Sequence, residues 1–397
     1  MRYFCLIFMS FLFGCGGGGG GGAPAPASTP VSSNVAPGTN VVSLYAATVN
    51  VNILLASVTV CTPNTSNCQV IPNLLVDTGS YGIRILKSAL SVPLTQVTGS
   101  GGNPLAECAP FASGYTWGPV EAADIAIGGE KAYGIPIQVI DDSQSPNPAV
   151  PASCSSTSIS IGSAAALNAN GVLGVGVFTN DCGASCTAAN NGVYFECPAT
   201  GCASLGEPAS FQVKNPVTQF ALDNNGLVIV LPQLPPSGAS SLSGSMIFGI
   251  GTRSNNALGQ ANVLMLDGSG NLTTVFNGQA LTSSFLDSGS NMLFFQDGTT
   301  PACKIVIGGY CPSSTQQFSA TLQAANSPTP SVSVSFSVAN GDALVSTGNN
   351  ILFNNIAGSP TAPGTFDWGL PFFFGRSVFF AVSGSMTPAG PGPFVAF

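Results

Sequence analysis

A short motif headed by an acidic residue occurs twice in the sequence. The two copies are Asp77-Thr78-Gly79-Ser80 and Asp287-Ser288-Gly289-Ser290. Isolated Asp-x-Gly turns are commonly structural. Two copies that lie 210 residues apart (287 minus 77), each directly after a largely apolar stretch, are not expected by chance. Asp77 and Asp287 are therefore candidate catalytic residues.

Two aspartates of this kind can share one proton if the fold brings them together. Carboxylates within hydrogen-bonding distance of each other cannot both ionise, so they titrate as a pair. The ionised member then takes a proton from a water held between them, while the protonated member polarises a carbonyl. Asp77 and Asp287 would thus form a hydrolytic dyad that needs neither a metal nor a cofactor.

The other residues of each motif suit the support of such a pair. The glycine allows a tight turn in which backbone amides reach the carboxylate. The Thr or Ser before the glycine is expected to bond across to the opposite loop, and the final serine is expected to donate to an outer carboxylate oxygen. The predicted supporting residues are Thr78, Gly79, Ser80, Ser288, Gly289 and Ser290.

The composition removes the main competing chemistries. The chain of 397 residues contains no histidine, which excludes the Ser-His-Asp triad, the Cys-His pair and histidine-ligated zinc. A net charge of -8, with only 8 Lys and Arg residues, argues against nucleic acid as a partner, because phosphate backbones are bound by clustered basic residues. A carboxylate pair is one of the few hydrolytic sites that this chain can build.

The first residues have the pattern of an exported lipoprotein. A basic start precedes an apolar stretch, residues 3–13, that is too short to span a membrane. The stretch ends in Leu-Phe-Gly-Cys, which resembles a lipobox with Cys15 as the lipidated residue, and Gly16 resembles an outer-membrane sorting signal. A plain secretory signal cut further on is the alternative. We expect a signal peptide at residues 1–15 and a flexible Gly/Ala/Pro/Ser-rich tether at 16–40.

The cysteines predict disulfide bonds. Two of the 12 cysteines lie in the targeting segment, which leaves an even number in the exported chain and favours disulfides in an oxidising compartment. Cys61 with Cys68, and Cys303 with Cys311, have the spacing of local loop closures. A four-thiolate zinc site is the alternative for the dense later group, but its spacing lacks a tight CxxC pair. Three further bridges are expected among Cys108, Cys154, Cys182, Cys186, Cys197 and Cys202.

Short stretches rich in β-branched and aromatic residues, bounded by Gly, Pro, Asn and Ser, predict strands along the whole chain. The clearest of these stretches are residues 41–60, 123–129, 134–140, 227–232, 245–251, 332–338 and 377–382. Long helices are not expected; one short helix is predicted at 320–327 and another at the end of 157–171. The fold class is therefore all-β.

Each motif is followed at a similar distance by a glycine in an apolar segment. Gly174 lies 97 residues after Asp77 (174 minus 77), and Gly369 lies 82 residues after Asp287 (369 minus 287). Such a glycine marks a place where the chain passes close to another backbone. The repeated order of motif and glycine predicts two similar lobes.

Together these features resemble the pepsin-like, bilobal aspartic peptidases over nearly all of the exported chain. The segments that carry the resemblance are 58–80, 114–129, 170–176, 244–251, 276–295 and 368–382. It implies a double β-barrel with an active-site cleft between an N-terminal lobe at 41–243 and an interlobe strand with a C-terminal lobe at 244–397. More narrowly, the lipobox, DTGSYGIRIL, GYTWGPV and DSGSNMLFF resemble a bacterial lipoprotein family of unknown function.

The flap hairpin departs from the family pattern. The flap of that family carries a tyrosine that covers the site, but counting back from the glycines at 128–129 places Phe111 there, with Tyr115 and Trp117 nearer the hairpin tip. Either the register slips or the flap works differently, and all three residues are flap candidates. A disulfide through Cys108 is expected to pin this hairpin.

Arg84 follows the first motif closely and allows three interpretations. It can lower the pKa of the aspartate pair, bind a substrate carboxylate, or form a surface ion pair. The surface ion pair is the favoured interpretation, because most arginines near a turn are solvated.

Three functions of different classes fit the sequence. The first is a monomeric aspartic endopeptidase, lipid-anchored at the outer membrane on its periplasmic or surface face, that hydrolyses polypeptides through Asp77 and Asp287. The second is a catalytically inactive pepsin-fold envelope lipoprotein that binds peptide or another envelope component, which the altered flap favours. The third is an unrelated β-sandwich or adhesin-like surface protein whose Asp-containing turns are structural, and the paired motifs argue against it. We expect the first.

Overall fold

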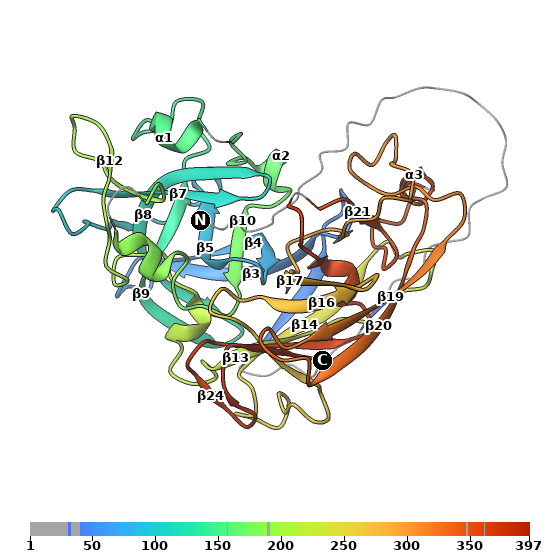
Figure 1. Ribbon diagram of the computed structural model, residues 1–397. Coiled ribbons are helices and arrows are strands. Elements are labelled where there is room, and N and C mark those ends of the chain that lie inside the picture. Colours follow the sequence, from blue (N-terminus) through green and yellow to red (C-terminus); the bar gives the residue numbers. More distant parts are fainter. Residues whose placement is uncertain (1–30, 33–39, 157, 189–190, 347, 361) are drawn as a thin grey trace.

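The computed structural model shows a mostly β protein (Figure 1). It describes residues 31–32 and 40–397, except 157, 189–190, 347 and 361. The predicted signal peptide, Cys15 and nearly all of the predicted tether lie outside the described residues. Within the described ranges, no helix is long and apolar enough to cross a membrane.

The first half of the chain is built from strands with two short helices between them. The strands are β1 (Val31–Ser32), β2 (Val41–Ala46), β3 (Leu54–Cys61), β4 (Cys68–Asp77), β5 (Tyr81–Leu86), β6 (Thr95–Gln96), β7 (Leu105–Phe111), β8 (Gly114–Ile127), β9 (Glu130–Ile140), β10 (Gly171–Val175), β11 (Tyr194–Glu196) and β12 (Ala203–Ser204). The helices are α1 (Ala152–Ser155) and α2 (Ala164–Leu167). Helix α2 is the short helix predicted at the end of 157–171.

The second half is also strand-rich. Its strands are β13 (Gly226–Val230), β14 (Leu242–Phe248), β15 (Val263–Met265), β16 (Leu272–Phe276), β17 (Gln279–Leu286), β18 (Leu293–Phe294), β19 (Gln316–Gln323), β20 (Ser331–Val338), β21 (Ala357–Gly358), β22 (Asp367–Trp368), β23 (Ser377–Ala381), β24 (Met386–Thr387), β25 (Gly390–Pro391) and β26 (Phe394–Ala396). Its helix is α3 (Gly341–Ser346). Short 3-10 turns occur at Lys87–Ala89, Gly183–Thr187, Pro216–Gln219 and Leu370–Phe372.

The same strand arrangement occurs once around each motif. In the first half, β10 runs parallel to β4 and antiparallel to β5, so it lies between the strands that enter and leave the first motif. In the second half, β22 runs parallel to β17 and antiparallel to β18 around the second motif. The all-β fold class expected from the sequence is therefore confirmed, and the strand unit around the motif occurs twice.

The two predicted glycines, Gly174 and Gly369, lie where the strand between the two motif-flanking strands approaches the segment that follows the motif. We call this strand, β10 in the first half and β22 in the second, the crossing strand. A Cβ atom on Gly174 would lie 2.8 Å from the carbonyl oxygen of Gly82, and one on Gly369 would lie 2.1 Å from the carbonyl oxygen of Met292. No side chain fits at either distance, which confirms the close backbone approach expected from the sequence. This close approach sets the distance between each crossing strand and the segment that follows the motif.

Strands from distant parts of the chain join the two halves. Strand β14 pairs with β2 and β13, β13 pairs with β23, and β26 pairs with β23 and β15. In Figure 1 the labelled strands β13 and β14 lie low in the view, between the blue-to-green part on the left and the orange part on the right. The expected lobe boundary between residues 243 and 244 lies inside β14.

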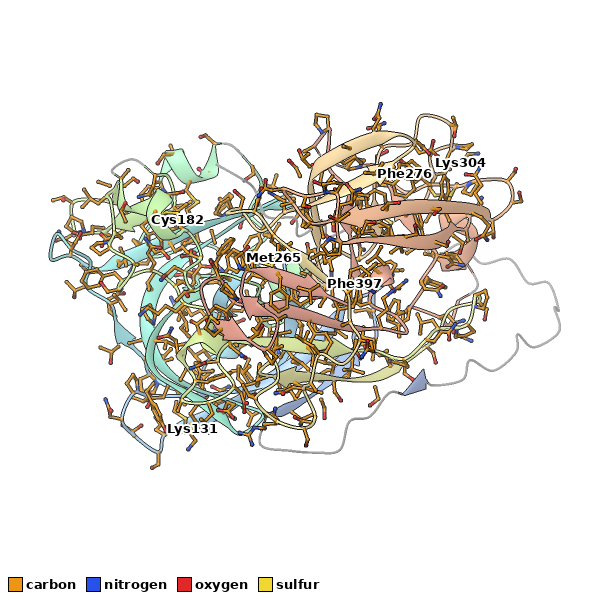
Figure 2. The ribbon with its side chains drawn as sticks, turned by 60° about the horizontal axis from the view of Figure 1, so that its bottom comes forward. Lys131, Cys182, Met265, Phe276, Lys304 and Phe397 are labelled. Atoms are coloured by element: carbon orange, nitrogen blue, oxygen red, sulfur yellow. A yellow bond between two sulfur atoms is a disulfide. The ribbon has the colours of Figure 1, made fainter. Side chains whose placement is uncertain are left out.

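An aromatic core fills the second lobe. Figure 2 labels Phe276 in this lobe and Cys182 in the opposite half of the molecule. The rings stack and meet edge-on at centroid distances between 4.2 Å and 6.3 Å. They belong to Phe276, Phe295, Phe318, Phe336, Phe366 and Trp368. Because the last two residues flank Asp367 in sequence, this core also anchors the crossing strand β22.

The helix predicted at residues 320–327 is wrong. The first half of that segment belongs to β19, which pairs with β20 along its whole length and with β16 near its end. Its side chains alternate in burial, with Ala320 and Leu322 buried and their neighbours partly exposed. The segment contains good helix formers, but cross-strand pairing outweighs their weak intrinsic preference.

Disulfides close loops in both lobes. Cys61 bonds to Cys68 directly across the β3–β4 hairpin, and the other expected local closure joins Cys303 and Cys311. Both closures were predicted. The remaining described bridges are Cys108–Cys154, Cys182–Cys186 and Cys197–Cys202. The first of these ties the β7–β8 hairpin to α1, as expected for a pinned flap.

The loop lengths predict which of two bridges contributes more to stability. Chain-entropy arguments give about 4 kcal/mol for the 46-residue Cys108–Cys154 separation and about 2 kcal/mol for the 7-residue Cys61–Cys68 separation. We therefore expect Cys108→Ala/Cys154→Ala to lower the free energy of unfolding more than Cys61→Ala/Cys68→Ala does. Urea denaturation of the two double variants measures this. Equal losses would contradict the expected order.

Candidate active site

The two motif loops bring Asp77 and Asp287 together at the junction of the lobes. A side-chain hydrogen bond joins the two carboxyl groups. Each glycine of the motifs faces the opposite aspartate: a Cβ on Gly79 would lie 2.8 Å from Asp287 Cγ, and one on Gly289 would lie 2.8 Å from Asp77 Oδ1. Only glycine leaves room for the carboxyls to meet. Asp77 is 1% exposed and Asp287 0% exposed.

Reciprocal hydrogen bonds tie the two loops to each other. The Thr78 N–H donates to Ser288 Oγ at 3.2 Å, and the Ser288 N–H donates to Thr78 Oγ1 at 2.9 Å. Each hydroxyl then donates to the strand before the opposite aspartate: Thr78 Oγ1 to Leu286 O at 3.2 Å, and Ser288 Oγ to Val76 O at 2.7 Å. All four groups are buried, so the loops hold a fixed separation.

Each carboxylate also receives two bonds from its own loop. The Gly79 N–H donates to Asp77 Oδ1 at 2.8 Å, and the Gly289 N–H donates to Asp287 Oδ1 at 2.7 Å. The last serine of each motif donates to the other oxygen, Oδ2, at 2.9 Å in the case of Ser290. Ser80 makes the equivalent bond to Asp77 Oδ2. The structure thus brings together all eight residues that the two motifs predicted.

Burial and charge set the protonation of the pair. Burial raises the pKa of Asp287 well above its ordinary value, and the negative charge of Asp77 raises it further. Burial also raises the pKa of Asp77, but hydrogen bonds from Ser80 and Asp287 oppose this effect. Asp287 is therefore the member that holds the proton, and Asp77 is the member that ionises first.

A third carboxyl at the site was missed by the sequence analysis. Asp367, the first residue of β22, is 1% exposed, and its Oδ2 atom lies 2.7 Å from Ser290 Oγ. The segment around it was interpreted as apolar residues before Gly369. An acid between two aromatic residues, in a chain with only 16 acidic residues, was the signal that could have identified it.

The flap candidates lie in the β7–β8 hairpin but point to different faces of it. Phe111 pairs with Gly114 at the hairpin tip, so the prediction that Tyr115 and Trp117 lie nearer the tip is wrong. Phe111 packs into an apolar cluster beneath the hairpin. Tyr115 and Trp117 lie on the other face, in a cluster with the Cys108–Cys154 bridge. All three side chains are buried, and no described hydrogen bond links any of them to the aspartate pair.

Arg84 is not at the surface, so the surface ion pair predicted for it is wrong. Its side chain is buried and makes salt bridges with Glu107 and, at 3.1 Å, with Asp181. The guanidinium lies 5.6 Å from the centre of the Phe111 ring. With both carboxylates bound, Arg84 supports the flap hairpin from below. Its charge also lowers the pKa of Asp77, as the smallest of the causes that act there.

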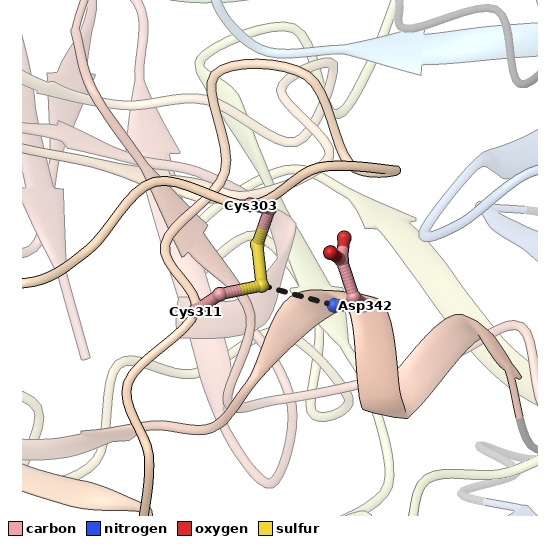
Figure 3. Close-up of side chains that lie close together, drawn as sticks. All are labelled: Cys303, Cys311 and Asp342. Carbon is pink, nitrogen blue, oxygen red and sulfur yellow. Dashed lines mark hydrogen bonds between the residues drawn. A yellow bond between two sulfur atoms is a disulfide. The ribbon is translucent and has the colours of Figure 1, made fainter.

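One described cluster has the composition of a metal site but not its chemistry. Cys303, Cys311 and Asp342 lie within 4.8 Å of one another (Figure 3). The cysteines form a disulfide, so neither can offer a thiolate. The Asp342 carboxylate accepts backbone N–H bonds from residues 304–306, and its own N–H donates to Cys311 Sγ at 3.3 Å. These contacts make the cluster a structural clamp between α3 and its neighbouring loop.

Comparison with known proteins places the chain in a family. No curated protein sequence matches it. Among solved structures, the aspartic proteinase from Irpex lacteus is similar over 90% of this chain and 96% of its own, at 13% identity and a TM-score of 0.48. The family described as "Protein of unknown function (DUF3443)" matches residues 30–397. The chain therefore belongs to this family of proteins of unknown function (DUF3443).

Proposed function

We propose that the protein is an aspartic endopeptidase that hydrolyses peptide bonds with Asp77, Asp287 and an activated water. The observation that carries the proposal is the hydrogen-bonded pair of buried aspartates, supported by matching bonds from two loops that also bind each other. A buried like-charge pair is costly unless it shares a proton. Turns that are only structural have no need of such a pair.

The protonation of the pair assigns a role to each aspartate. Asp77, whose pKa is raised less, takes a proton from the water, and the water oxygen forms a bond to the scissile carbonyl carbon. Asp287, whose pKa is raised more, gives its proton to the carbonyl oxygen. The resulting tetrahedral diol collapses when the C–N bond breaks: Asp77 gives its proton to the leaving amine, and Asp287 takes a proton back from one hydroxyl of the diol. Both aspartates then return to their starting state.

The cross-loop bonds keep the pair ready for this chemistry. Thr78 and Ser288 hold the loops through buried bonds at 2.7 Å to 3.2 Å, so neither carboxylate needs to move before reaction. Preorganised groups of this kind stabilise a transition state without reorganisation during the reaction.

The proposed substrates are polypeptides outside the cytoplasm. The disulfides of the described chain support export, because such bonds persist in oxidising compartments. The proposed lipid anchor is Cys15, at the end of the predicted signal peptide. We propose that residues 16–40 tether a monomeric catalytic body to the outer membrane.

A second candidate function is binding of peptide or another envelope component without cleavage. Two observations favour it. The dyad is at most 1% exposed, and the flap aromatics pack into the hairpin's own clusters rather than over the aspartates. The two functions differ in one respect only, which is whether a bound peptide is cut.

Loss of either aspartate should abolish cleavage. We expect Asp77→Asn and Asp287→Asn to lower kcat by at least about a thousandfold, since neither variant can both accept and donate a proton. Cleavage of a denatured protein substrate between about pH 3 and pH 7 measures this. The chain contains no histidine that could replace the aspartate as a general base. Asp142→Asn, which changes a carboxylate that bonds Ser88 away from the site, is the matched control.

Three results would go against the dyad as the catalytic centre. Cleavage that survives either substitution is one, and cleavage that a statine-type inhibitor does not reduce is another. A folded wild-type protein that cuts nothing at any pH would favour the binding function instead.

The raised pKa of Asp287 predicts how one substitution changes stability with pH. The folded protein keeps a proton that the unfolded chain releases above about pH 4, the ordinary pKa of aspartate. This contribution to stability is complete below that pH and is lost as the pH rises toward the folded-state pKa. Asp287→Asn removes this titration. The free energy of unfolding of the variant, relative to that of the wild type, should therefore increase between about pH 4 and pH 7.

Urea denaturation at both pH values measures the difference between the two proteins. If the variant's free energy of unfolding instead decreased relative to that of the wild type as the pH rose, Asp287 would be ionised in the folded state. The protonation assigned to it would then be wrong.

A further inference from the structure

We propose that Asp367 is a positioning residue of the dyad: it stays protonated, donates to Ser290, and thereby holds the Ser290 hydroxyl as a donor to Asp287. The inference rests on the proposed function for its catalytic meaning. The carboxyls of Asp367 and Asp287 meet at a single hydroxyl, since Ser290 Oγ lies 2.7 Å from Asp367 Oδ2 and 2.9 Å from Asp287 Oδ2.

The number of hydrogens at this junction requires a protonated carboxyl. A serine hydroxyl has one hydrogen, and an ionised carboxylate has none to offer. Ser290 Oγ can therefore donate to one of its two carboxyl neighbours, and the other contact needs a carboxylic acid as donor. All three side chains are at most 1% exposed, so solvent does not relieve the conflict.

The surroundings identify Asp367 as the donor. Asp287 Oδ1 accepts the Gly289 N–H at 2.7 Å, whereas Asp367 Oδ1 is buried with no hydrogen-bond partner among the described residues. An ionised carboxylate with one oxygen unpaired is far more costly to bury than a neutral acid. Burial raises the pKa of Asp367 well above its ordinary value; the Ser290 contact opposes this effect, and the charge of Asp77 adds to it.

The strands packed against Asp367 supply no compensating cation. It pairs with Phe285 on β17 and with Phe294 on β18, and neither partner titrates. The titratable groups that act on it are Asp287, through Ser290, and Asp77. Among the described ion pairs, none includes any of the three carboxyls.

In the first lobe the position that matches Asp367 is occupied by Val172. Val172 pairs with Leu75 on β4 as Asp367 pairs with Phe285 on β17, so an apolar side chain occupies the matching place. Ser80 accordingly has Asp77 as its described carboxyl partner. The third carboxyl is therefore specific to the loop of Asp287 and breaks the symmetry of the dyad.

This asymmetry places the shared proton. With the Ser290 hydrogen directed at Oδ2, Asp287 carries its own proton on Oδ1. That oxygen lies near Asp77 Oδ1, since both atoms approach the position of a Cβ on Gly289, at 3.1 Å and 2.8 Å. A neutral Asp367 thus directs the proton of Asp287 toward its partner without adding a charge beside it.

The direct test is a 13C NMR titration of the full protein with its aspartate carboxyl carbons labelled. The Asp367 signal is the one that Asp367→Asn removes. We expect it to keep the chemical shift of a protonated acid at about pH 6, about two units above the ordinary aspartate pKa. A signal that titrates near the ordinary value would overturn the proposal, whether or not the protein cleaves peptides.

Two isosteric variants give the kinetic test. Asp367→Asn keeps a neutral donor to Ser290, so kcat should stay within about threefold of wild type, with KM unchanged. Asp367→Val copies the first lobe and removes the donor, so kcat should fall at least about tenfold, again with KM unchanged. Neither variant can ionise at residue 367, so both should extend the alkaline limb of the pH–rate profile.

The NMR titration and the kinetic comparison together distinguish failure of the role of Asp367 from failure of the proposed endopeptidase function. Equal losses in both variants, or an unmoved alkaline limb, would overturn the role of Asp367, because a space-filling role does not act on the pH profile. A wild-type protein that cleaves nothing would overturn the endopeptidase proposal alone, and the NMR titration would then decide on Asp367.

Discussion

Two carboxyl groups buried against each other cannot both carry a charge, and much of this fold is arranged around that constraint. The crossing strands β10 and β22 support the motif loops, and glycines at their ends allow the backbones to approach closely. Bonds between Thr78 and Ser288 fix the distance between the loops. Because the pair is desolvated, the protonation state of the two carboxyl groups depends on these few contacts rather than on solvent. The architecture converts a costly burial into a defined protonation state.

The duplication of the strand unit gives the pair its symmetry, and single side chains remove it. Val172 and Asp367 occupy matching places beside the two motifs, yet one is apolar and the other acidic. The buried Arg84 is a second difference, since it lies after the first motif and lowers the pKa of Asp77. Arg84 favours the ionised form of Asp77, whereas Asp367, which we propose to be neutral, orients the Ser290 hydroxyl without adding a charge beside Asp287. A division of labour between acid and base follows from these positions.

Features that depend on local sequence could be predicted, and features that depend on distant partners could not. The motifs, the strands and the short disulfide loops follow from spacing and β-branched composition, and the absence of histidine narrowed the chemistry. The environment of Arg84 was missed because its partners, Glu107 and Asp181, come from other strands and loops. The role of Asp367 could not be predicted because its partner, Ser290, lies 77 residues away in the sequence. The flap order was wrong because hairpin register depends on turn geometry.

The placement of protons at the site can be observed directly. Neutron diffraction from crystals of the deuterated protein at about pH 6, well above the ordinary aspartate pKa, would locate each hydrogen in the Asp77, Asp287 and Asp367 cluster. The structure predicts one deuteron between Asp77 and Asp287 and a second on Asp367, directed at Ser290. A dyad that carries no deuteron, or one deuteron on each carboxyl, would contradict shared-proton chemistry at this site.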